Sequence, residues 1–389
     1  KNYLLSNNMS LFKSVKIINS GKSILLSRKY GAPLRYHSTW LLDNALDSKT
    51  RDKNNGQRLI SVLDIPVNTY IKSASLDKKG QNVTLKFLPK EKQVKFSSSW
   101  LVSHAYDKKK NNSKVWIDPD LKTWTKTTLK SVPIISYKSA KSDKKLLLKW
   151  LKSLHCYGFA KMTGGKIESG ALIQIANLFG YVRETNYGKW FEVRSEINAV
   201  NLAYTSLGLH AHTDNPYRDP VPTMQILYCL ENSASGGDSI VVDGFNAAIH
   251  LKNKNSDYFN LLSKYCARFE YSGVKGTHLK SRRPMIELSP DGELIAIRFN
   301  NRSVAPITDV PYEDMENYYK AYRTFSDIIN DSKLAVNFKL NPGECFIVDN
   351  TRVLHARTAY SEAGTRWLQG CYVDKDGLLS TISTMLEKK

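Results

Sequence analysis

The chain has 389 residues, of which 41% are apolar and 11% aromatic, as in globular proteins with a sizeable core. No run of about 18 apolar residues occurs, which argues against a membrane-spanning helix. Its five cysteines are widely spaced and odd in number, which argues against a secreted disulfide framework and favours a reducing compartment.

The charge balance is strongly basic, because 57 Lys and Arg residues face 36 Asp and Glu residues and leave a formal net charge of +21. Such charge indicates a nucleic-acid or membrane partner when it gathers on one face. Here the lysines are scattered along the chain, and the densest run, residues 107–114, has the composition of a solvated linker. We therefore expect neither nucleic acid nor a membrane as a partner.

The first 42 residues contain no Asp or Glu and combine Lys and Arg with Ser, Leu and Ile. This composition resembles a mitochondrial targeting segment, so we predict a mitochondrial location, with the cytoplasm as the alternative. A basic, strand-rich edge of the first domain would have the same composition, and that interpretation stays open.

Short apolar runs separated by glycine and proline predict a small β-rich domain over residues 15–105. Its clearest strand is residues 82–87, where apolar and polar side chains alternate. Residues 106–130 are polar and rich in Lys and Thr, which is typical of a connection. We place the N-terminal domain at residues 1–118 and a second domain at residues 119–389.

The second domain is predicted to be mainly β with inserted helices. We expect helices at residues 143–154 with Ser142 as the N-cap, 167–179, 258–266, 312–330 and from about 376 onward. We expect strands at residues 157–162, 224–230, 239–242, 294–299, 337–340, 345–348 and 368–373. Many short strands predict a double-sheet β barrel of the jelly-roll kind, a double-stranded β-helix. No internal repeat is apparent.

Two histidines and one carboxylate are the candidates for a metal site. His212 and Asp214 are alternate residues of an expected strand, so their side chains can point to the same side. His355 follows far downstream, and Arg366 comes eleven positions after it. Two histidines and a carboxylate are the ligand set of non-haem Fe(II) sites. A histidine is often structural, however, and the spacing by itself leaves both interpretations open.

The ordered motifs resemble those of the γ-butyrobetaine dioxygenase and trimethyllysine dioxygenase family, within the wider group that includes taurine dioxygenase. The resemblance covers residue 140 to the C-terminus and, more weakly, the N-terminal part. It rests on Tyr187-Gly188, Asn201-x-Ala203-Tyr204-Thr205, His212-Thr213-Asp214, Gln225, Gly236-Gly237-Asp238-Ser239, Val242-Asp243-Gly244-Phe245, Phe299-Asn300-Asn301, Asp349-Asn350, His355 and Arg366.

The resemblance implies that His212, Asp214 and His355 bind Fe(II) and that 2-oxoglutarate is the co-substrate beside O2. Arg366 would pair with the distal carboxylate of 2-oxoglutarate, as the planar guanidinium group favours, and Ser239 would assist it. The resemblance also implies ascorbate as a reductant and a homodimer.

Four aromatic residues match the positions that enclose a trimethylammonium group in butyrobetaine enzymes. Ring faces attract such a cation, which cannot donate hydrogen bonds. The four are Tyr187, Phe191, Tyr204 and Tyr372, with Phe191 at a position where the family has Trp. They could instead be barrel core, and the sequence does not decide between the two. By the same resemblance, Asn201 and Asn300 are assigned to the substrate carboxylate.

The start of the N-terminal domain, residues 34–44, resembles that of the family, in which a cysteine cluster often follows and holds zinc. Here residues 45–48 are Ala-Leu-Asp-Ser. The four nitrogen or sulfur ligands of a structural zinc site are therefore missing, and zinc is not expected.

The resemblance implies hydroxylation of a small trimethylammonium acid, most simply γ-butyrobetaine to L-carnitine. N6-trimethyllysine is the alternative substrate, and a trimethylammonium phosphonate is a third. A different class of protein, a basic nucleic-acid-binding protein on a decayed dioxygenase fold, is disfavoured by the complete set of His212, Asp214, His355 and Arg366.

Overall fold

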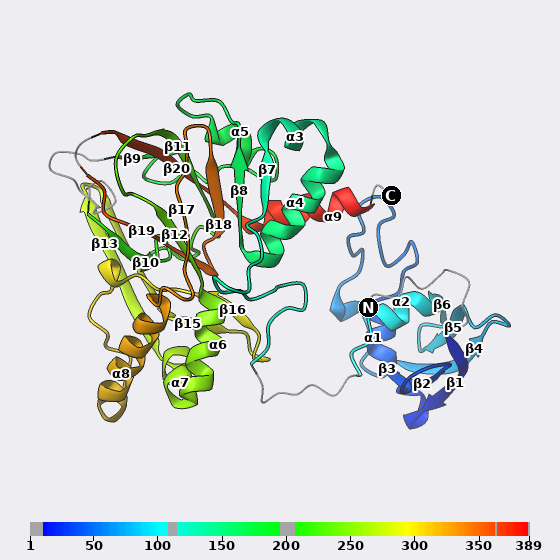
Figure 1. Ribbon diagram of the computed structural model, residues 1–389. Helices are drawn as coiled ribbons and strands as arrows, with labels where there is room; N and C mark the ends of the chain where they lie inside the picture. The colour runs from blue at the N-terminus through cyan, green and yellow to red at the C-terminus, as the bar shows by residue number, and fades with distance from the viewer. Residues whose placement is uncertain (1–10, 108–114, 195–206, 362–363, 388–389) are drawn as a thin grey trace. The chain divides into compact units, whose positions relative to one another are not determined.

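The computed structural model describes residues 11–107, 115–194, 207–361 and 364–387, and these form two compact units (Figure 1). Unit 1 is Lys1–Asn111 and unit 2 is Asn112–Lys389. The boundary between the units lies a few residues before the expected one at residue 118. Trp116 belongs to unit 2, because its backbone pairs with that of Glu293 in the same unit.

Unit 1 contains two three-stranded antiparallel sheets, in the orders β1-β2-β3 and β4-β5-β6. Alternate strand residues, such as Val83, Leu85 and Phe87, are buried in one apolar core, as period-two patterning predicts. The elements are β1 (Phe12–Ile18), β2 (Ser23–Arg28), β3 (Leu34–His37), α1 (Ser38–Asp43), β4 (Tyr70–Leu76), β5 (Asn82–Leu88), β6 (Lys92–Ser97) and α2 (Ser98–Ser103).

The acid-free segment at the start of the chain is largely folded. From Phe12 onward it forms β1, β2, β3 and most of α1, and it buries Phe12, Ile24 and Leu26 in the core of unit 1. For the residues from Phe12 onward, the structure therefore supports the interpretation as a basic, strand-rich edge of the first domain. Residues 1–10 lie outside the described part of the chain.

Unit 1 also carries an internal repeat, so the expectation of none was wrong. Each half is three antiparallel strands followed by a short helix. The segments 34–45 and 94–105 share Ser, Trp, Leu and Ala at the same offsets. Their tryptophans, Trp40 and Trp100, lie with ring centroids 5.6 Å apart. The repeat was missed because few residues are identical and the shared pattern is chiefly one of burial.

Unit 2 is built on two sheets. The six-stranded sheet has the order β7-β8-β18-β11-β20-β9, and the four-stranded sheet has the order β10-β19-β12-β17. Except for the parallel β7–β8 pair, neighbouring strands are antiparallel. The strands are β7 (Ile134–Ser136), β8 (Phe159–Thr163), β9 (Phe191–Val193), β10 (Leu209–His212), β11 (Met224–Asn232), β12 (Ser239–Asp243), β17 (Val336–Phe338), β18 (Cys345–Asp349), β19 (Val353–Arg357) and β20 (Arg366–Val373).

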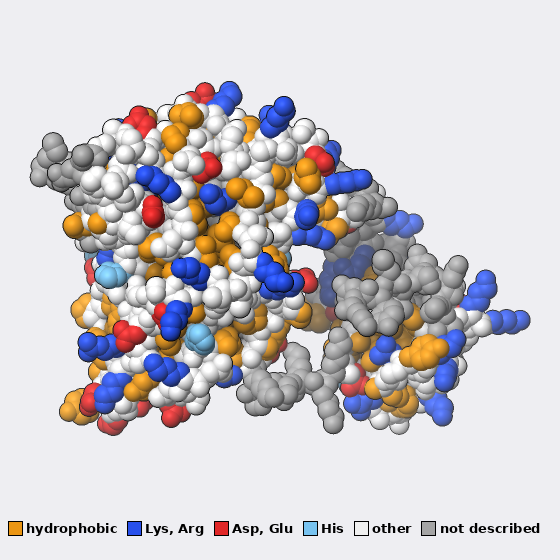
Figure 2. All heavy atoms as spheres, in the orientation of Figure 1, with side chains coloured by type: hydrophobic (Ala, Val, Ile, Leu, Met, Phe, Trp, Pro, Cys, Tyr) orange, Lys and Arg blue, Asp and Glu red, His pale blue; other side chains and the backbone are white. Residues whose placement is uncertain are grey.

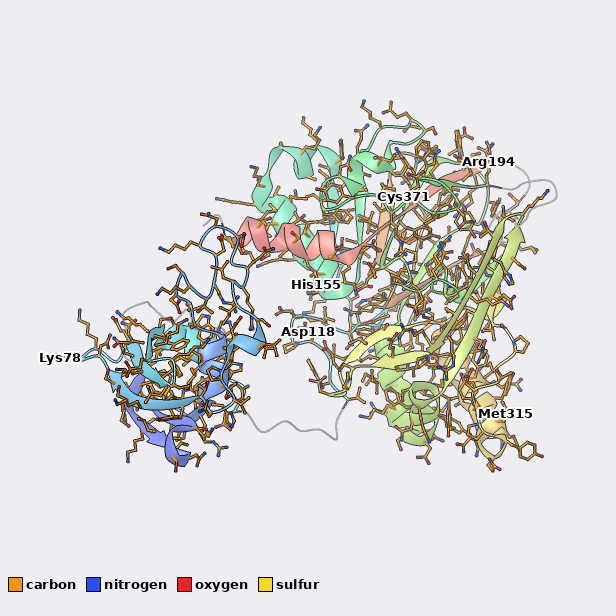
Figure 3. The ribbon with its side chains drawn as sticks, turned by 180° about the vertical axis from the view of Figure 1, so that it is seen from behind. Lys78, Asp118, His155, Arg194, Met315 and Cys371 are labelled. Carbon is orange, nitrogen blue, oxygen red and sulfur yellow. The ribbon has the colours of Figure 1, made fainter. Side chains whose placement is uncertain are left out.

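Both sheets contribute to one apolar cluster, to which β11, β18 and β20 bring Leu227, Phe346 and Leu368, and β12 and β19 bring Val241 and Val353. The opposite faces are covered by helices. Leu151 of α4 and Leu172 of α5 pack in a cluster with Cys371 of β20, which is labelled in Figure 3. These helices are α3 (Tyr137–Ser142), α4 (Lys144–Tyr157), α5 (Leu172–Ala176) and α9 (Lys375–Glu387).

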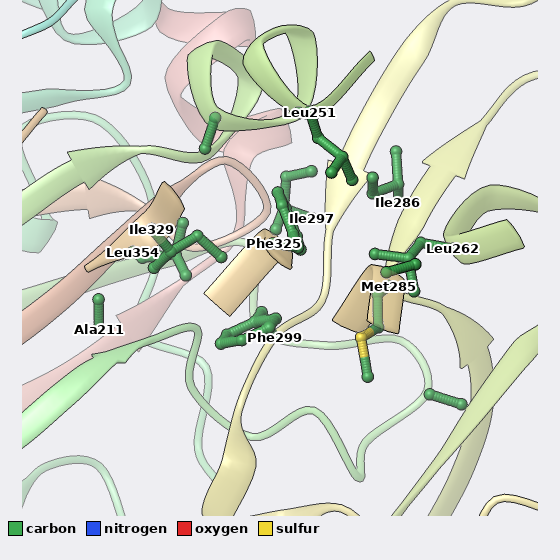
Figure 4. Packing of buried hydrophobic residues seen from close by; sticks show 14 of the residues in the cluster. Ala211, Leu251, Leu262, Met285, Ile286, Ile297, Phe299, Phe325, Ile329 and Leu354 are labelled. Carbon is green, nitrogen blue, oxygen red and sulfur yellow. The ribbon is translucent and has the colours of Figure 1, made fainter. Parts of the chain in front are cut away.

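The four-stranded sheet is covered by α6 (Gly244–Lys254), α7 (Ser256–Lys264) and α8 (Tyr312–Ile329). Figure 4 shows Ala211 of β10 and Leu354 of β19 in the same cluster as Phe325 of α8. Because side chains alternate along a strand, burial of Ala211 and Leu354 here turns His212 and His355 to the other face. Two ribbons complete the unit: β13 (Cys266–Val274) with β14 (Thr277–Pro284), and β15 (Ile286–Leu288) with β16 (Leu294–Ile297).

Several expected elements differ from the structure. Asp143, not Ser142, caps α4, because its carboxylate accepts the backbone N–H groups of Lys145 and Leu146. The helix expected at 167–179 is reduced to α5, since Gly170 adopts a positive φ of 81° and its N–H donates to Gln369. Helix α6 and the β13–β14 ribbon were missed, because α6 follows β12 directly and the ribbon is rich in charged residues. Among the described residues, no helix is long and apolar enough to cross a membrane.

A buried ion pair joins the end of β12 to the turn before β19 and to two segments outside the sheets. The guanidinium group of Arg352 donates to the Asp243 carboxylate at 3.1 and 3.0 Å, and both side chains are fully buried. It also donates to the carbonyl oxygens of Lys122 and Cys156 at 2.6 and 3.0 Å. The Arg352 side chain, just before β19, thereby contacts three other segments. Asp243 is the N-cap of α6, Cys156 lies in the last turn of α4, and Lys122 lies in the connection that precedes β7.

Replacing Arg352 with Met should lower the free energy of unfolding by about 3–5 kcal/mol, since it leaves the Asp243 carboxylate buried without its partner. Urea unfolding followed by circular dichroism measures the change. A matched control is Lys320→Met, which removes an exposed pair with Glu316 and should leave the unfolding midpoint nearly unchanged. Equal effects of the two substitutions would contradict the role of the buried pair.

Candidate active site

Three side chains converge at one end of the space between the sheets. The ligand atoms of His212, Asp214 and His355 all lie within 4.8 Å of one another, and this is the one such His, Cys, Asp or Glu group within the described ranges. An Asp214 Oδ1 atom lies 3.3 Å from Nε2 of His212 and 3.7 Å from Nε2 of His355. A metal ion bound by these three atoms would have its protein ligands on one side and would keep coordination positions open on the other.

Strand pairing places the two histidines together. His212 ends β10 and lies directly opposite His355 of β19, so their rings are 4.4 Å apart. Nδ1 of His212 lies 2.8 Å from its acceptor, the carbonyl oxygen of His210. Because that bond places the proton on Nδ1, Nε2 keeps its lone pair for a metal.

Asp214 is held by its backbone at the end of β18 and by its carboxylate on β11 and β20. Asn350, which follows β18, accepts the Asp214 N–H at 2.7 Å and donates to the Asp214 carbonyl oxygen at 3.0 Å. Gln225 of β11 and Tyr372 of β20 face each other across the sheet, and both donate to Asp214 Oδ2, at 2.6 and 2.8 Å. The other carboxylate oxygen is left to face the histidines.

Burial and neighbouring charge set the protonation of these groups. Burial lowers the pKa of His212, and burial together with the charges of His212 and Arg302 lowers the pKa of His355 to about 3. Burial alone would raise the pKa of Asp214, but the two nearby imidazoles and the hydrogen bond from the Tyr372 hydroxyl hold it well below its ordinary value. Neutral imidazoles and an ionised carboxylate are the forms that bind a metal.

Arg366 lies on the same face of β20 as Tyr372, six residues away, which is about 20 Å along a strand. Its Nε donates to the carbonyl oxygen of Gly237 at 3.2 Å, whereas its Nη1 is buried and has no hydrogen-bond partner. A Cβ atom at Gly237 would lie 2.7 Å from the Arg366 side chain, so only glycine permits this approach. A buried, unpaired guanidinium N–H fits an incoming carboxylate.

One cavity of about 280 Å³ connects these groups. Arg366, Ser239 and Arg357 line it, and so do His212, Asp214 and His355. Aromatic rings line it as well. Phe191 packs 5.2 Å from Tyr372 and 6.1 Å from Tyr187, measured between ring centroids. Three of the four expected aromatic residues therefore lie together around this cavity.

The fourth, Tyr204, and the expected substrate-binding Asn201 lie outside the described residues. Asn300 lines the cavity, but its amide is engaged: Nδ2 donates to the carbonyl oxygen of Thr213 at 3.1 Å, and Oδ1 accepts the Arg302 N–H at 3.1 Å.

Sequence reasoning missed several cavity residues. Tyr217 accepts or donates a hydrogen bond with the Tyr187 hydroxyl at 3.0 Å and stacks on Tyr271 at 4.9 Å. Tyr217 follows the metal motif closely in the sequence, so its position was a usable signal. Tyr271 comes from the β13–β14 ribbon, and no local pattern indicated it. Arg302 and Arg357 also line the cavity and were not selected.

The chain is similar to known proteins over most of its length. The model of the family described as taurine catabolism dioxygenase TauD, TfdA family matches residues 127–372. The chain is 31% identical to human gamma-butyrobetaine dioxygenase over 360 residues, 91% of this chain and 92% of the human protein. It is 32% identical to the Pseudomonas sp. (strain AK-1) gamma-butyrobetaine dioxygenase over 348 residues, 89% of each protein.

A second group of relatives is nearly as similar. Mouse mitochondrial trimethyllysine dioxygenase is 29% identical over 359 residues, 90% of this chain and 83% of that protein. The resemblance that the motifs indicated is thereby confirmed, and the matched 91% of the chain includes part of the N-terminal unit.

The lowered imidazole pKa values predict that the site binds a divalent metal down to mildly acidic pH. The Mn(II) affinity at pH 5.5 should stay within about threefold of that at pH 7.5, whereas an imidazole with a pKa of about 6.5 would weaken it roughly tenfold. Calorimetric titration of the metal-free protein measures this, with Asp214→Ala as the non-binding control. If the Mn(II) affinity fell by about two orders of magnitude, as expected when both histidines keep their ordinary pKa, the lowered pKa values would be contradicted.

Proposed function

The chain belongs to the taurine catabolism dioxygenase TauD, TfdA family, and from this premise we propose that it is an Fe(II)- and 2-oxoglutarate-dependent dioxygenase that hydroxylates a small trimethylammonium acid. We take γ-butyrobetaine, converted to L-carnitine, as its substrate. The observation that carries the proposal is a single cavity lined by the His212, Asp214 and His355 group, by Arg366 and by aromatic rings. We interpret the two sheets around this cavity as the double-stranded β-helix of this enzyme class.

His212, Asp214 and His355 would hold Fe(II), which with 2-oxoglutarate supplies the oxidising chemistry that yields succinate, CO2 and a hydroxylated substrate. The unpaired Nη1 of Arg366 would bind the distal carboxylate of 2-oxoglutarate, with Ser239 beside it. Gln225 and Tyr372 would keep Oδ2 of Asp214 occupied, so that Oδ1 is the atom presented to the metal. The pKa of Tyr372 is raised by burial and by Asp214, so its hydroxyl stays protonated and continues to donate.

The aromatic rings would hold the trimethylammonium group. Tyr187, Phe191 and Tyr372 bring their rings to one region of the cavity. Tyr217 and Tyr271, which stack on each other, line the same cavity, and Tyr217 is hydrogen-bonded to Tyr187. A quaternary ammonium group gains attraction from several faces at once and needs no hydrogen-bond acceptor. Because Tyr372 also touches Asp214, this end of the substrate would lie close to the metal ligands.

The remaining proposals concern partners and location. We infer that ascorbate supports activity, that the N-terminal unit folds without zinc and that the protein functions as a homodimer. Binding to nucleic acid is not expected, since Lys and Arg side chains are interspersed with acidic and apolar ones on the face in Figure 2. A mitochondrial location is supported by the mouse relative, which is named as mitochondrial.

Succinate formation tests the proposed function. The protein is incubated with Fe(II), ascorbate, O2 and 2-oxoglutarate, and γ-butyrobetaine or N6-trimethyllysine is added separately. We expect γ-butyrobetaine to stimulate succinate release and to yield carnitine in equal amount. Stimulation by trimethyllysine alone would assign the alternative substrate. No stimulation by either compound, in protein that binds Fe(II), would contradict the proposal.

Replacing Tyr187 with Leu should raise the KM for γ-butyrobetaine by roughly 10- to 30-fold, as expected for losing one desolvated cation–π contact. The KM for 2-oxoglutarate should change less than about threefold, because Arg366 lies at the other end of β20. Steady-state kinetics with each substrate varied in turn measure both. The exposed Tyr181 serves as control through Tyr181→Leu. An unchanged KM for γ-butyrobetaine would place the trimethylammonium group elsewhere.

A further inference from the structure

We propose that Tyr217 and Asn215 are positioning residues that hold the Tyr187 ring in one orientation, so that the bound substrate presents one C–H bond for hydroxylation. This inference rests on the proposed function. It gives a role to a chain of hydrogen bonds that begins at a ring of the aromatic group and ends at the residue after the proposed metal ligand Asp214.

The three side chains of this hydrogen-bonded chain all line the cavity. The Tyr217 hydroxyl donates to Asn215 Oδ1 at 2.6 Å, and the Tyr187 hydroxyl lies 3.0 Å from the Tyr217 hydroxyl. Burial raises the pKa of both tyrosines, so both hydroxyls keep their protons. A hydroxyl has one proton, and Tyr217 uses its own on Asn215. Tyr187 is therefore the donor in the bond between the two tyrosines.

Asn215 is suited to end this chain by its backbone conformation and by its buried amide. It follows Asp214 directly, has a positive φ of 51° and is 5% exposed. Asparagine adopts this left-handed conformation more readily than most residues other than glycine. Its Nδ2 is buried and has no hydrogen-bond partner in the described part of the chain. The acceptor Oδ1 is thus the amide atom through which the side chain acts.

The turn that carries Tyr217 is itself held firmly. The buried guanidinium group of Arg298 donates from Nη1 to the carbonyl oxygens of Pro216 and Arg218, at 2.8 and 3.0 Å. The Tyr217 ring stacks on Tyr271, with ring centroids 4.9 Å apart and planes inclined by 22°. Backbone and ring contacts together therefore keep the Tyr217 hydroxyl in place as an acceptor for a second residue.

Both tyrosines that are proposed to hold the trimethylammonium group are tied to the same short segment. Tyr372 donates to the Asp214 carboxylate at 2.8 Å. Through Tyr217, Tyr187 is linked to Asn215, the residue that follows this carboxylate. The orientation of both rings is thereby set relative to the proposed metal ligand. The place of a cation between the rings then decides which C–H bonds of a short substrate lie near the metal.

A change in the orientation of the Tyr187 ring should affect the reaction more than binding. A ring that has lost its hydrogen bond still attracts a quaternary ammonium group. Reaction is more demanding, because a misplacement of about 1 Å can lower a rate by about 100-fold. Loss of the bond should therefore allow 2-oxoglutarate to be consumed without hydroxylation of the substrate.

The test measures the carnitine and succinate that the full chain forms from γ-butyrobetaine and 2-oxoglutarate with Fe(II), ascorbate and O2. Wild type should form the two products in nearly equal amounts. Tyr217→Phe keeps the ring and its stack and removes the hydroxyl. It should lower the ratio of carnitine to succinate at least about threefold and kcat for carnitine roughly tenfold, whereas the KM for γ-butyrobetaine should change less than about threefold.

Tyr187→Phe breaks the same hydrogen bond from the other side and should lower the ratio to the same extent. Because both substitutions remove one bond, the double variant should lie within about twofold of either single variant. Two independent contributions would instead multiply.

Two further variants separate positioning from stability. Asn215→Gly accepts the positive φ and removes only the amide, so it should reproduce the lowered ratio. Tyr228, which does not line the cavity, donates its buried hydroxyl to the Lys166 carbonyl oxygen at 2.6 Å. Tyr228→Phe should lower the temperature of unfolding and leave the ratio of carnitine to succinate unchanged.

Three results would overturn the inference while the proposed function stands. They are a wild-type ratio in Tyr217→Phe or Asn215→Gly, a change confined to the KM for γ-butyrobetaine, and an equal loss of the ratio in Tyr228→Phe. Failure of wild type to hydroxylate γ-butyrobetaine would remove the proposed function, and this inference with it.

Discussion

The pairing of β10 with β19 is the constraint on which the rest of unit 2 depends. It sets His212 opposite His355, and burial of Ala211 and Leu354 against the helices fixes which face the histidines occupy. A shift of β10 by one residue in this register would turn the His212 imidazole into the apolar cluster and away from His355. The hydrogen bonds from Gln225 and Tyr372 to Asp214 then complete the group from the other sheet.

The cavity between the sheets has two ends with different chemistry, and the spacing along β20 separates them. Tyr372 stands beside Asp214 and the aromatic rings, and Arg366 stands about 20 Å away along the strand with an unpaired N–H. Gly370 between them carries no side chain, and a Cβ there would meet the Phe191 ring at 2.3 Å. The positions and sizes of residues on one strand would thus order the two proposed ligands around the proposed metal site.

The sequence was most informative where a short pattern carries chemistry. His212, Asp214 and Arg366 could be selected as candidates because the residue types that bind metals and carboxylates are visible in the sequence. The expected strand through both His212 and Asp214 was wrong, since β10 ends at His212. Long periodic helices such as α8 were predicted nearly to the residue. Tyr271 could not be found, because its place in the cavity depends on how a charged ribbon folds back. The short α5 departs from its apolar pattern because Gly170 and Gln369 make a contact between residues far apart in the chain.

The central claim is that His212, Asp214 and His355 hold one Fe(II) ion to which 2-oxoglutarate, anchored by Arg366, can bind. Anaerobic visible absorption tests it most directly, because an α-keto acid chelated to Fe(II) gives a metal-to-ligand charge-transfer band. We predict that the band forms when 2-oxoglutarate is added to the Fe(II)-loaded protein and is absent in Asp214→Ala. A protein that binds both Fe(II) and 2-oxoglutarate without developing the band would contradict the account.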